Sequence, residues 1–351
     1  MEDNRYALQM QDITVEFPGV LANDHVSIDC KKGEVLGLLG ENGAGKTTLM
    51  NVLYGLYPPS SGKILLDGRE VQIGSPSEAI SYGIGMVHQH FKFVDTLSVI
   101  ENVILGIPSK KQHLDLEPAK RRLLELCEEY ELYVDPDEIV WRLPVGRQQW
   151  VEILKALYRD CKVLVLDEPT AVLTPAESDQ LCCAIRHITE KGRSVIFISH
   201  KLREVIQITD RVTVIRDGKY IGTVDTKDAT QLTLAQMMVG RPVSIERKER
   251  PCFTDKEPAL VMKDVNAVDD RGIPALKNFN LTVHAGEIVG VAGVDGNGQR
   301  ELAECISGMR KLTSGSITIK GRPVTGVIAD PSFLGFIPED RQKSGLVIDF
   351  S

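Results

Sequence analysis

The sequence predicts an α/β fold in which a doubly wound, mostly parallel sheet carries a small antiparallel β layer and a helical insertion. A glycine-rich loop over residues 40–48 follows the apolar run 35–39 and precedes helix-compatible residues, which gives a strand–loop–helix context. Residues 162–166 and 194–199 are apolar runs of the kind found in central parallel strands that are covered on both faces. In addition, the beginning of the chain recurs near its end.

The antiparallel layer is expected at the start of the chain. Short segments that alternate between polar and apolar residues precede the glycine-rich loop, as they do in half-buried strands. Phe17 ends one such segment. It could stack on an adenine ring, and a core aromatic of the β layer is an equally strong interpretation.

The loop from Gly40 to Thr48 fits the phosphate-binding pattern G-x-x-x-x-G-K-[ST]. Its glycines let successive N–H groups point at one anion, and the next helix adds its positive N-terminus. We expect Lys46 to neutralise β- and γ-phosphate oxygens and the Thr47 hydroxyl to ligate Mg²⁺. The candidate ATP-binding residues of the loop are Gly40, Glu41, Asn42, Gly43, Ala44, Gly45, Lys46, Thr47 and Thr48. A turn without a ligand is the alternative, which the partners further along the chain disfavour.

Two acids follow the apolar run 162–166. Asp167 and Glu168 stand at the carboxyl end of this expected strand, where open α/β sheets bind their ligands. We expect Asp167 to hold Mg²⁺ through water and Glu168 to orient or deprotonate the attacking water. Buried strands rarely end in two acids for structural reasons alone.

Two polar residues complete the expected site. His200 follows the run 194–199 and is placed for a γ-phosphate contact, although a strand-end histidine is more often a surface residue. Gln89 follows the apolar segment 83–87 and is a candidate for both catalysis and the Mg²⁺ site. An ordinary loop glutamine is the alternative.

A helical insertion is expected at about residues 95–160. Residues 114–131 are rich in helix formers, with Leu123, Leu124, Cys127 and Tyr130 near helical spacing. This apolar stripe is interpreted as packing.

The composition is that of an ordinary globular protein, with 351 residues, 42% of them hydrophobic and 26% charged. The net charge of -8 argues against nucleic acid as the main partner. No apolar run reaches the roughly 18 residues that a membrane-spanning helix needs. The seven cysteines lack C-x-x-C spacing and are interpreted as buried thiols rather than disulfides or metal ligands.

The internal repeat divides the chain. Residues 7–13 recur as 259–265 and residues 33–37 recur as 286–290, at a domain-sized offset of 253 residues between the two glycine-rich loops. A charged, proline-containing stretch separates the copies. We therefore expect a first domain over residues 1–240, a linker over 241–257 and an incomplete second domain over 258–351.

The order of these features resembles the ABC-transporter ATPases. The resemblance is carried by the phosphate loop, Gln89, the segment Leu143-Pro144-Val145-Gly146-Arg147-Gln148-Gln149, the pair Asp167-Glu168 and His200. A duplication within one chain is similar to the ATP-binding subunits of sugar and nucleoside importers. Residues 86–91 and 167–175 resemble the nucleoside branch, which is linked to basic membrane proteins, more than the ribose/galactose branch.

The resemblance implies an ATP hydrolase that uses ATP and Mg²⁺ to energise nucleoside import at the cytoplasmic face of a bacterial plasma membrane. It implies integral-membrane permease subunits as partners, contacted by residues 90–93 and the helical insertion, and indirectly an extracytoplasmic solute-binding lipoprotein. A homodimer is a further arrangement that could close a site. Three alternatives stay open: a simple-sugar importer, a soluble tandem ABC ATPase and a non-catalytic nucleotide sensor. The short mixed linker and the acidic balance disfavour the soluble tandem ATPase.

Several positions depart from the family pattern. The family signature reads Leu-Ser-Gly-Gly-Gln, and here Pro144 replaces its serine and Arg147 its glutamine. Thr174 stands where the family has an aspartate after the acidic pair. In the second loop Gln299 replaces the lysine and Arg300 the Ser/Thr ligand of Mg²⁺, so this loop should bind nucleotide weakly or without metal.

Both weak elements would face the same position of a head-to-tail sandwich, which leaves one degenerate and one competent site. The second signature and the second acidic strand would lie beyond Ser351. We therefore expect a fragment of a longer polypeptide. Its second domain is expected to hold only the β layer, the degenerate loop and the first core strands, which leaves an unpaired sheet edge and uncovered apolar surface.

Overall fold

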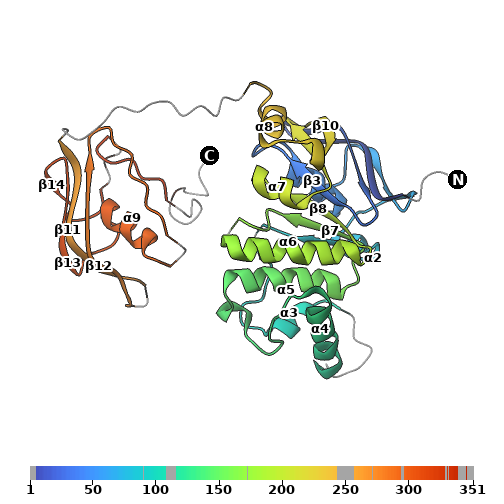
Figure 1. Ribbon diagram of the computed structural model, residues 1–351, viewed down its shortest axis with the longest axis horizontal. Helices are drawn as coiled ribbons and strands as arrows, with labels where there is room; N and C mark the ends of the chain where they lie inside the picture. Colours follow the sequence, from blue (N-terminus) through green and yellow to red (C-terminus); the bar gives the residue numbers. More distant parts are fainter. Residues whose placement is uncertain are drawn as a thin grey trace. The chain divides into compact units, whose positions relative to one another are not determined.

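The computed structural model describes residues 5–89, 91–107, 116–171, 173–242, 257–270, 272–293, 296–328, 330, 332–338 and 345. The chain divides into two compact units, Met1–Ile245 and Glu246–Ser351, each of which is described by itself (Figure 1).

The first unit is built on a six-stranded sheet with the order β10-β9-β3-β8-β7-β6. Four neighbouring pairs are parallel, and β10 pairs antiparallel with β9. Every residue of β3, β6, β7 and β8 is buried, as expected for continuous apolar runs in a covered sheet. The strands are β3 (Val35–Leu39), β6 (Ile84–Val87), β7 (Val163–Asp167), β8 (Ser194–Ile198), β9 (Arg211–Arg216) and β10 (Lys219–Asp225).

An antiparallel layer of order β2-β1-β4-β5 covers one face of this sheet. Because side chains alternate along a strand, Leu36 and Leu38 pack toward this layer, whereas Val35 and Leu39 pack into a second core on the opposite face. The layer contains β1 (Tyr6–Phe17), β2 (Val20–Lys31), β4 (Ser61–Leu66) and β5 (Arg69–Val71). Two helices join this side, α1 (Lys46–Leu53) and α2 (Pro76–Ser81).

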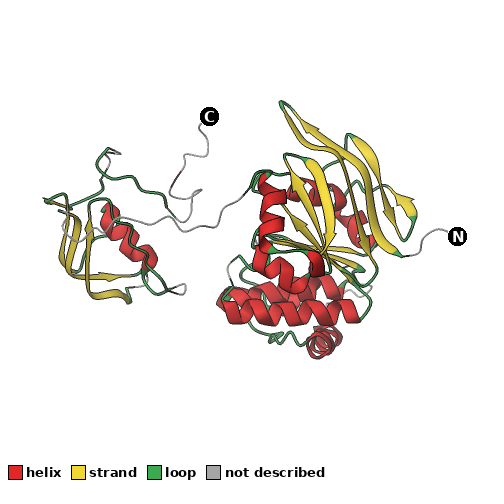
Figure 2. Ribbon diagram, turned by 45° about the horizontal axis from the view of Figure 1, so that its top comes forward, coloured by secondary structure: helices red, strands yellow, loops and turns green. Residues whose placement is uncertain are grey.

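The other helices gather on the opposite face, where Figure 2 shows most of the helices of this unit below its strands. Three of them form the insertion between β6 and β7, namely α3 (Val99–Ile104), α4 (Leu116–Tyr130) and α5 (Val145–Tyr158). The remainder are α6 (Pro175–Glu190), α7 (Leu202–Ile208) and α8 (Gln231–Val239), with short turns η1 (Val140–Arg142) and η2 (Thr226–Asp228).

Two expectations about single side chains are wrong in this unit. Leu124 is 45% exposed, because a step of one residue from buried Leu123 turns the side chain about 100° around α4. Cys183 is also exposed, whereas the neighbouring Cys182 faces the core from α6.

The second unit repeats the antiparallel layer with the equivalent strand order, β12-β11-β13-β14. Its elements are β11 (Pro258–Val268), β12 (Pro274–His284), β13 (Ser314–Ile319), β14 (Arg322–Pro323) and α9 (Gln299–Ser307). The expected first core strand is not formed at residues 287–293, where Ile288 is 77% exposed. Within the described part of this unit, that segment has no neighbouring strand with which to pair.

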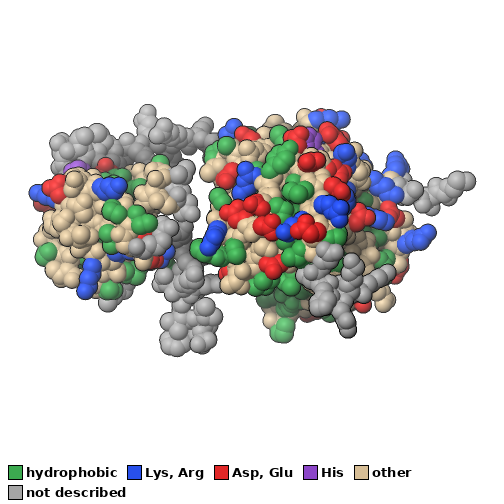
Figure 3. All heavy atoms as spheres, turned by 90° about the horizontal axis from the view of Figure 1, so that it is seen from below, with side chains coloured by type: hydrophobic (Ala, Val, Ile, Leu, Met, Phe, Trp, Pro, Cys, Tyr) green, Lys and Arg blue, Asp and Glu red, His purple; other side chains and the backbone are tan. Residues whose placement is uncertain are grey.

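Two further features of the described residues concern the charged side chains at the surface and the apolar character of the helices. Acidic and basic side chains are interspersed on the face of the first unit in Figure 3. Among the helices in the described ranges, none has both the length and the apolar character required to cross a bilayer.

Candidate functional site

The phosphate loop joins β3 to α1 by a tight backbone path. Gly43 and Gly45 adopt positive φ angles of 84° and 93°, and Gly45 is the residue directly before the first turn of α1. A side chain at Gly45 would collide with the backbone oxygen of Ala22. The carbonyl of Gly45 accepts a hydrogen bond from the amide of buried Asn23 at 3.2 Å, so β2 supports the loop from below.

Lys46 spans this loop with its ammonium group. Nζ donates to the carbonyls of Gly40 at 2.8 Å and Glu41 at 2.9 Å. Burial lowers the pKa of Lys46, and the nearby carboxylates of Glu168 and Asp167 oppose this shift. An ammonium group has three donors, so one stays available for a phosphate oxygen.

Thr47 and Asp167 bring two oxygen ligands together. The Thr47 hydroxyl donates to Asp167 Oδ2 at 3.3 Å across the gap between α1 and β7. Asp167 is 4% exposed, and burial raises the pKa of its carboxyl group. A hydroxyl and a carboxylate in this arrangement are the donor set that suits Mg²⁺, whose charge would favour the ionised form of Asp167.

Glu168 connects two other polar side chains of the site. Its Oε2 accepts from Gln89 Nε2 at 3.2 Å, and its Oε1 lies 2.8 Å from Nδ1 of His200. Three side chains that are distant in sequence thus meet at one carboxylate. The backbone of Glu168 has a φ of 48°, which is uncommon for a residue other than glycine and is typical of strained functional positions.

A second set of contacts, which the sequence reasoning missed, fixes the two loops that carry Glu168 and His200. The Thr170 hydroxyl donates to Glu204, and Lys201 Nζ donates to the Thr170 carbonyl at 2.7 Å. Thr170 is 1% exposed. No sequence spacing pairs these residues, because only the parallel alignment of β7 and β8 brings them together.

Phe17 lies at the exposed end of β1 and is 36% exposed. Its ring meets Tyr57 edge-on with 5.4 Å between centroids. The alternative of a core aromatic is therefore disfavoured, and both rings present surface on which a planar ligand could stack.

The segment Leu143–Gln149 opens α5 without a side-chain cap, because Pro144 occupies the capping position. Arg147 turns back onto its own helix, with its guanidinium carbon 4.0 Å from the centre of the Trp150 ring. It also donates to the Tyr133 carbonyl. Thr174, at the expected aspartate position, instead caps α6 by accepting from the Glu177 N–H at 3.3 Å.

The loop of the second unit has different contacts. The side chain of Gln299 lies against Gly293, where the loop begins. Arg300 pairs with Glu304 at 2.9 Å and with Asp270 at 3.6 Å, so its guanidinium is occupied by acids of its own unit. Val294 and Asp295 lie outside the described residues.

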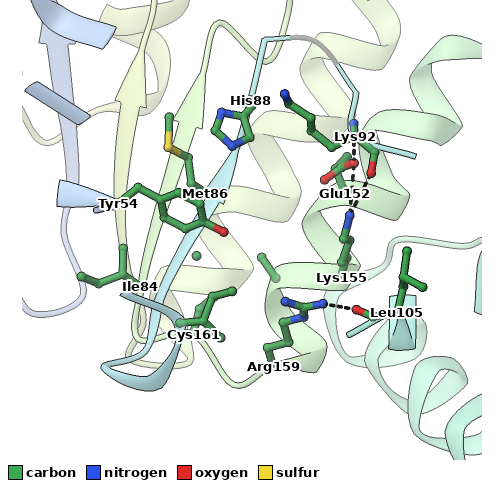
Figure 4. Close-up of a pocket in the computed structure, with 13 residues that line it drawn as sticks. Tyr54, Ile84, Met86, His88, Lys92, Leu105, Glu152, Lys155, Arg159 and Cys161 are labelled. Carbon is green, nitrogen blue, oxygen red and sulfur yellow. Dashed lines mark hydrogen bonds and ion pairs between the residues drawn. The ribbon is translucent and has the colours of Figure 1, made fainter. Parts of the chain in front are cut away.

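A separate cavity of about 280 Å³ is lined in part by His88, the residue before Gln89 (Figure 4). Tyr54, Ile84 and Met86 form its apolar wall, and Lys155 of α5 and Arg159, which directly follows α5, approach from the other side. Phe91 and Phe93, in the segment expected to contact a permease, stack on each other at 5.7 Å and are half-buried, so part of each ring stays accessible. The cationic rim and apolar wall give the cavity the character of a protein-contact surface. His90 lies outside the described residues.

The chain is similar in sequence to a family of known proteins. Residues 23–171 and 276–347 match the ABC transporter family. The chain is 48% identical over 353 residues to "Nucleoside import ATP-binding protein NupA" of Lactococcus lactis, covering 99% of this chain and 69% of the relative. It is 47% identical over 349 residues to "Guanosine import ATP-binding protein NupO" of Bacillus subtilis, covering 98% and 68%. It is also 47% identical over 378 residues to "Glucose import ATP-binding protein TsgD13" of Haloferax volcanii, covering 98% and 68%.

Among solved structures, a nucleotide-free ATP-binding cassette from an ABC transporter matches with a TM-score of 0.60 and 25% identity. The match covers 68% of this chain and 96% of the cassette. The ADP conformation of another such cassette matches with a TM-score of 0.59 and 25% identity, over 67% of this chain and 99% of that one.

Proposed function

We propose that this chain, which belongs to the ABC transporter family as an ATP-hydrolysing subunit of the sugar and nucleoside import type, energises the import of nucleosides. The names of the relatives NupA and NupO support a nucleoside, and those of the glucose- and ribose-importing relatives support the alternative of a simple sugar.

The hydrogen bonds around Glu168 support a catalytic role for this carboxylate. A carboxylate held by Gln89 on one oxygen and by His200 on the other is fixed in orientation and keeps lone pairs for a water molecule. We assign Glu168 as the base that orients or deprotonates water, with His200 and Gln89 directed at the γ-phosphate.

The phosphate loop supplies the binding part of this proposal. Lys46 and the N–H groups of the loop would hold the phosphates, and Phe17 would contact the adenine. Thr47, Asp167 and Gln89 would surround Mg²⁺, which neutralises phosphate charge when it is bound. The ion pair between Arg300 and Glu304 supports the prediction that the second loop binds nucleotide weakly or without metal.

The cavity lined by His88 is our candidate for the contact with a membrane permease. Its apolar wall would accept a short apolar segment, and His88 is followed in the chain by Gln89, which donates to Glu168. The proposal places the protein on the cytoplasmic face of the plasma membrane, with a solute-binding lipoprotein as an indirect partner. A homodimer is one way in which a second cassette could be supplied.

Transport in reconstituted vesicles tests this function. The chain, in its complex with the permease that co-purifies with it, should drive ATP-dependent uptake of labelled guanosine, and the Lys46→Ala complex should not. Uptake of ribose but not guanosine would favour the sugar alternative. Co-purification with ribosomes or DNA and no membrane partner would contradict the transport proposal.

A further inference from the structure

The backbone that follows Gln89 is held by side chains of α5. Glu152 Oε1 accepts a hydrogen bond from the N–H of Lys92 at 3.1 Å, and Lys155 Nζ donates to the carbonyl of the same residue at 3.1 Å. The two α5 side chains also form an ion pair at 3.7 Å. We call this arrangement, Glu152 and Lys155 around the main chain of Lys92, the Lys92 clamp (Figure 4).

A second pair of hydrogen bonds fixes the same segment to α3. Asn102 Oδ1 accepts from the N–H of Val94 at 2.9 Å, and its Nδ2 donates to the carbonyl of Val94 at 3.2 Å. Asn102 is fully buried. Lys92 and Val94 are therefore fixed to the helical insertion, because side chains of α5 and α3 hold both of their main-chain polar groups.

Burial shows that Glu152 is not an ordinary surface acid. Its side chain is 5% exposed, and a buried carboxylate costs free energy unless it is paired and hydrogen-bonded. Both partners of Glu152 belong to the clamp. We explain the burial of this carboxylate by its hydrogen bond to the main chain of Lys92, which lies three residues after Gln89.

We propose that Glu152 and Lys155 are positioning residues for ATP hydrolysis. By holding the main chain of Lys92 they fix Gln89, which in turn donates to Glu168 at 3.2 Å. Glu152, Lys155 and Lys92 also line the cavity described above. The assignment of these two positioning residues rests on the proposed function.

Turnover kinetics of the purified full chain test the clamp. Glu152→Ala should lower kcat about threefold to tenfold, as expected for the net loss of one ordinary hydrogen bond, and should leave KM for ATP–Mg within about twofold. Glu152→Gln keeps an oxygen that accepts from Lys92 and should retain most of kcat. Glu190→Ala, an exposed acid at the end of α6, is the matched control and should change neither kcat nor KM.

A double-variant cycle shows whether the effect passes through Gln89. If it does, Glu152→Ala should lower kcat no further in a Gln89→Ala background. Independent, multiplying losses would overturn the proposal, as would a Glu152→Gln variant as slow as Glu152→Ala. Amide hydrogen exchange supplies the readout without turnover, since Glu152→Ala should accelerate exchange at Lys92 by about threefold or more.

The clamp and the proposed function fail in different ways. Wild-type chain that never hydrolyses ATP, alone or with a permease, would contradict the function. Wild-type turnover together with unchanged kcat and unchanged Lys92 exchange in Glu152→Ala would overturn the clamp and leave the function standing.

Discussion

At the scale of single residues, the site depends on a carboxylate in an uncommon backbone conformation. The positive φ of Glu168 costs on the order of 1 kcal/mol, and the structure retains it because hydrogen bonds fix the surrounding loops. The main-chain N–H of Glu168 donates to the Ile198 carbonyl at 3.0 Å, and Thr170 is tied to Glu204 and Lys201. The carboxylate therefore reaches Gln89 and His200 without freedom to turn away.

Glu168→Gln should separate binding from turnover. The amide keeps the size of the side chain and its hydrogen bond to one neighbour, but it cannot take a proton from water. We expect the affinity for ATP–Mg to stay within about threefold and kcat to fall about 10²-fold or more in the transport complex. Normal steady-state hydrolysis by this variant would remove Glu168 from the role.

The two loops should differ in their contribution to nucleotide binding. Lys46→Ala removes a charged phosphate contact that is worth about 1.5–3 kcal/mol, so Kd for ATP–Mg should rise about 10- to 150-fold. Gln299→Ala should change Kd by less than about twofold, since that side chain is neutral and the neighbouring Arg300 is paired with acids. Titration calorimetry measures both, and equal losses would refute the asymmetry.

At the scale of elements, the phosphate loop shows why two glycines of one motif are not equivalent. Both Gly43 and Gly45 have positive φ, but a Cβ on Gly43 meets no atom within 4 Å. A Cβ on Gly45 would meet the Ala22 backbone and lie 2.6 Å from the Asn23 amide nitrogen. The first position is constrained by backbone conformation alone, and the second also by contact with β2.

Alanine at these two positions makes a matched pair. Gly43→Ala should cost about 1–2 kcal/mol of folding free energy. Gly45→Ala should cost about 1–3 kcal/mol more, because the contact with β2 is overpacked as well. Urea unfolding monitored by circular dichroism measures both, and equal destabilisation would show that contact with β2 is not limiting.

Elements with a local cause could be predicted from the sequence. The runs that became β3, β7 and β8 are apolar throughout because both of their faces are covered, and the glycine pattern predicts the loop directly. Contacts made by tertiary structure could not be predicted: Glu152, Asn102 and Thr170 act on partners 60, 8 and 34 residues away, and no spacing rule connects them.

The segment 287–293 failed as a strand prediction for a related reason. Its apolar pattern matches that of β3, but a strand also requires a neighbour to complete its hydrogen bonds. In the first unit β8 and β9 pair with β3 on its two sides. Among the described residues of the second unit no strand pairs with this segment, and the sequence pattern alone does not contain that information.

At the scale of the whole molecule, the two units differ in how completely they bury apolar side chains. The first unit has a core on each face of its sheet, and all members of both cores lie between Ala7 and Met238. Among its described residues, the second unit has one small core, between its β layer and α9. Ile288, Val291 and Val327 of that unit are 77%, 52% and 68% exposed. This is apolar surface of the kind that drives association.

We therefore predict that residues 1–245 fold alone and retain the ATP site. Every residue of the candidate site, from Phe17 to His200, lies within this unit, as do the residues of the Lys92 clamp. At a ligand concentration of about 100 Kd, ATP–Mg should stabilise the isolated unit by about 2.7 kcal/mol and raise its Tm by roughly 5–10 °C. The same fragment with Lys46→Ala should show no comparable shift, and residues 246–351 expressed alone should aggregate through their exposed apolar side chains. If residues 1–245 aggregated, or melted without an ATP-dependent shift that the full chain shows, the first unit would need the second for its structure, and the division of binding and folding between the two units would be wrong.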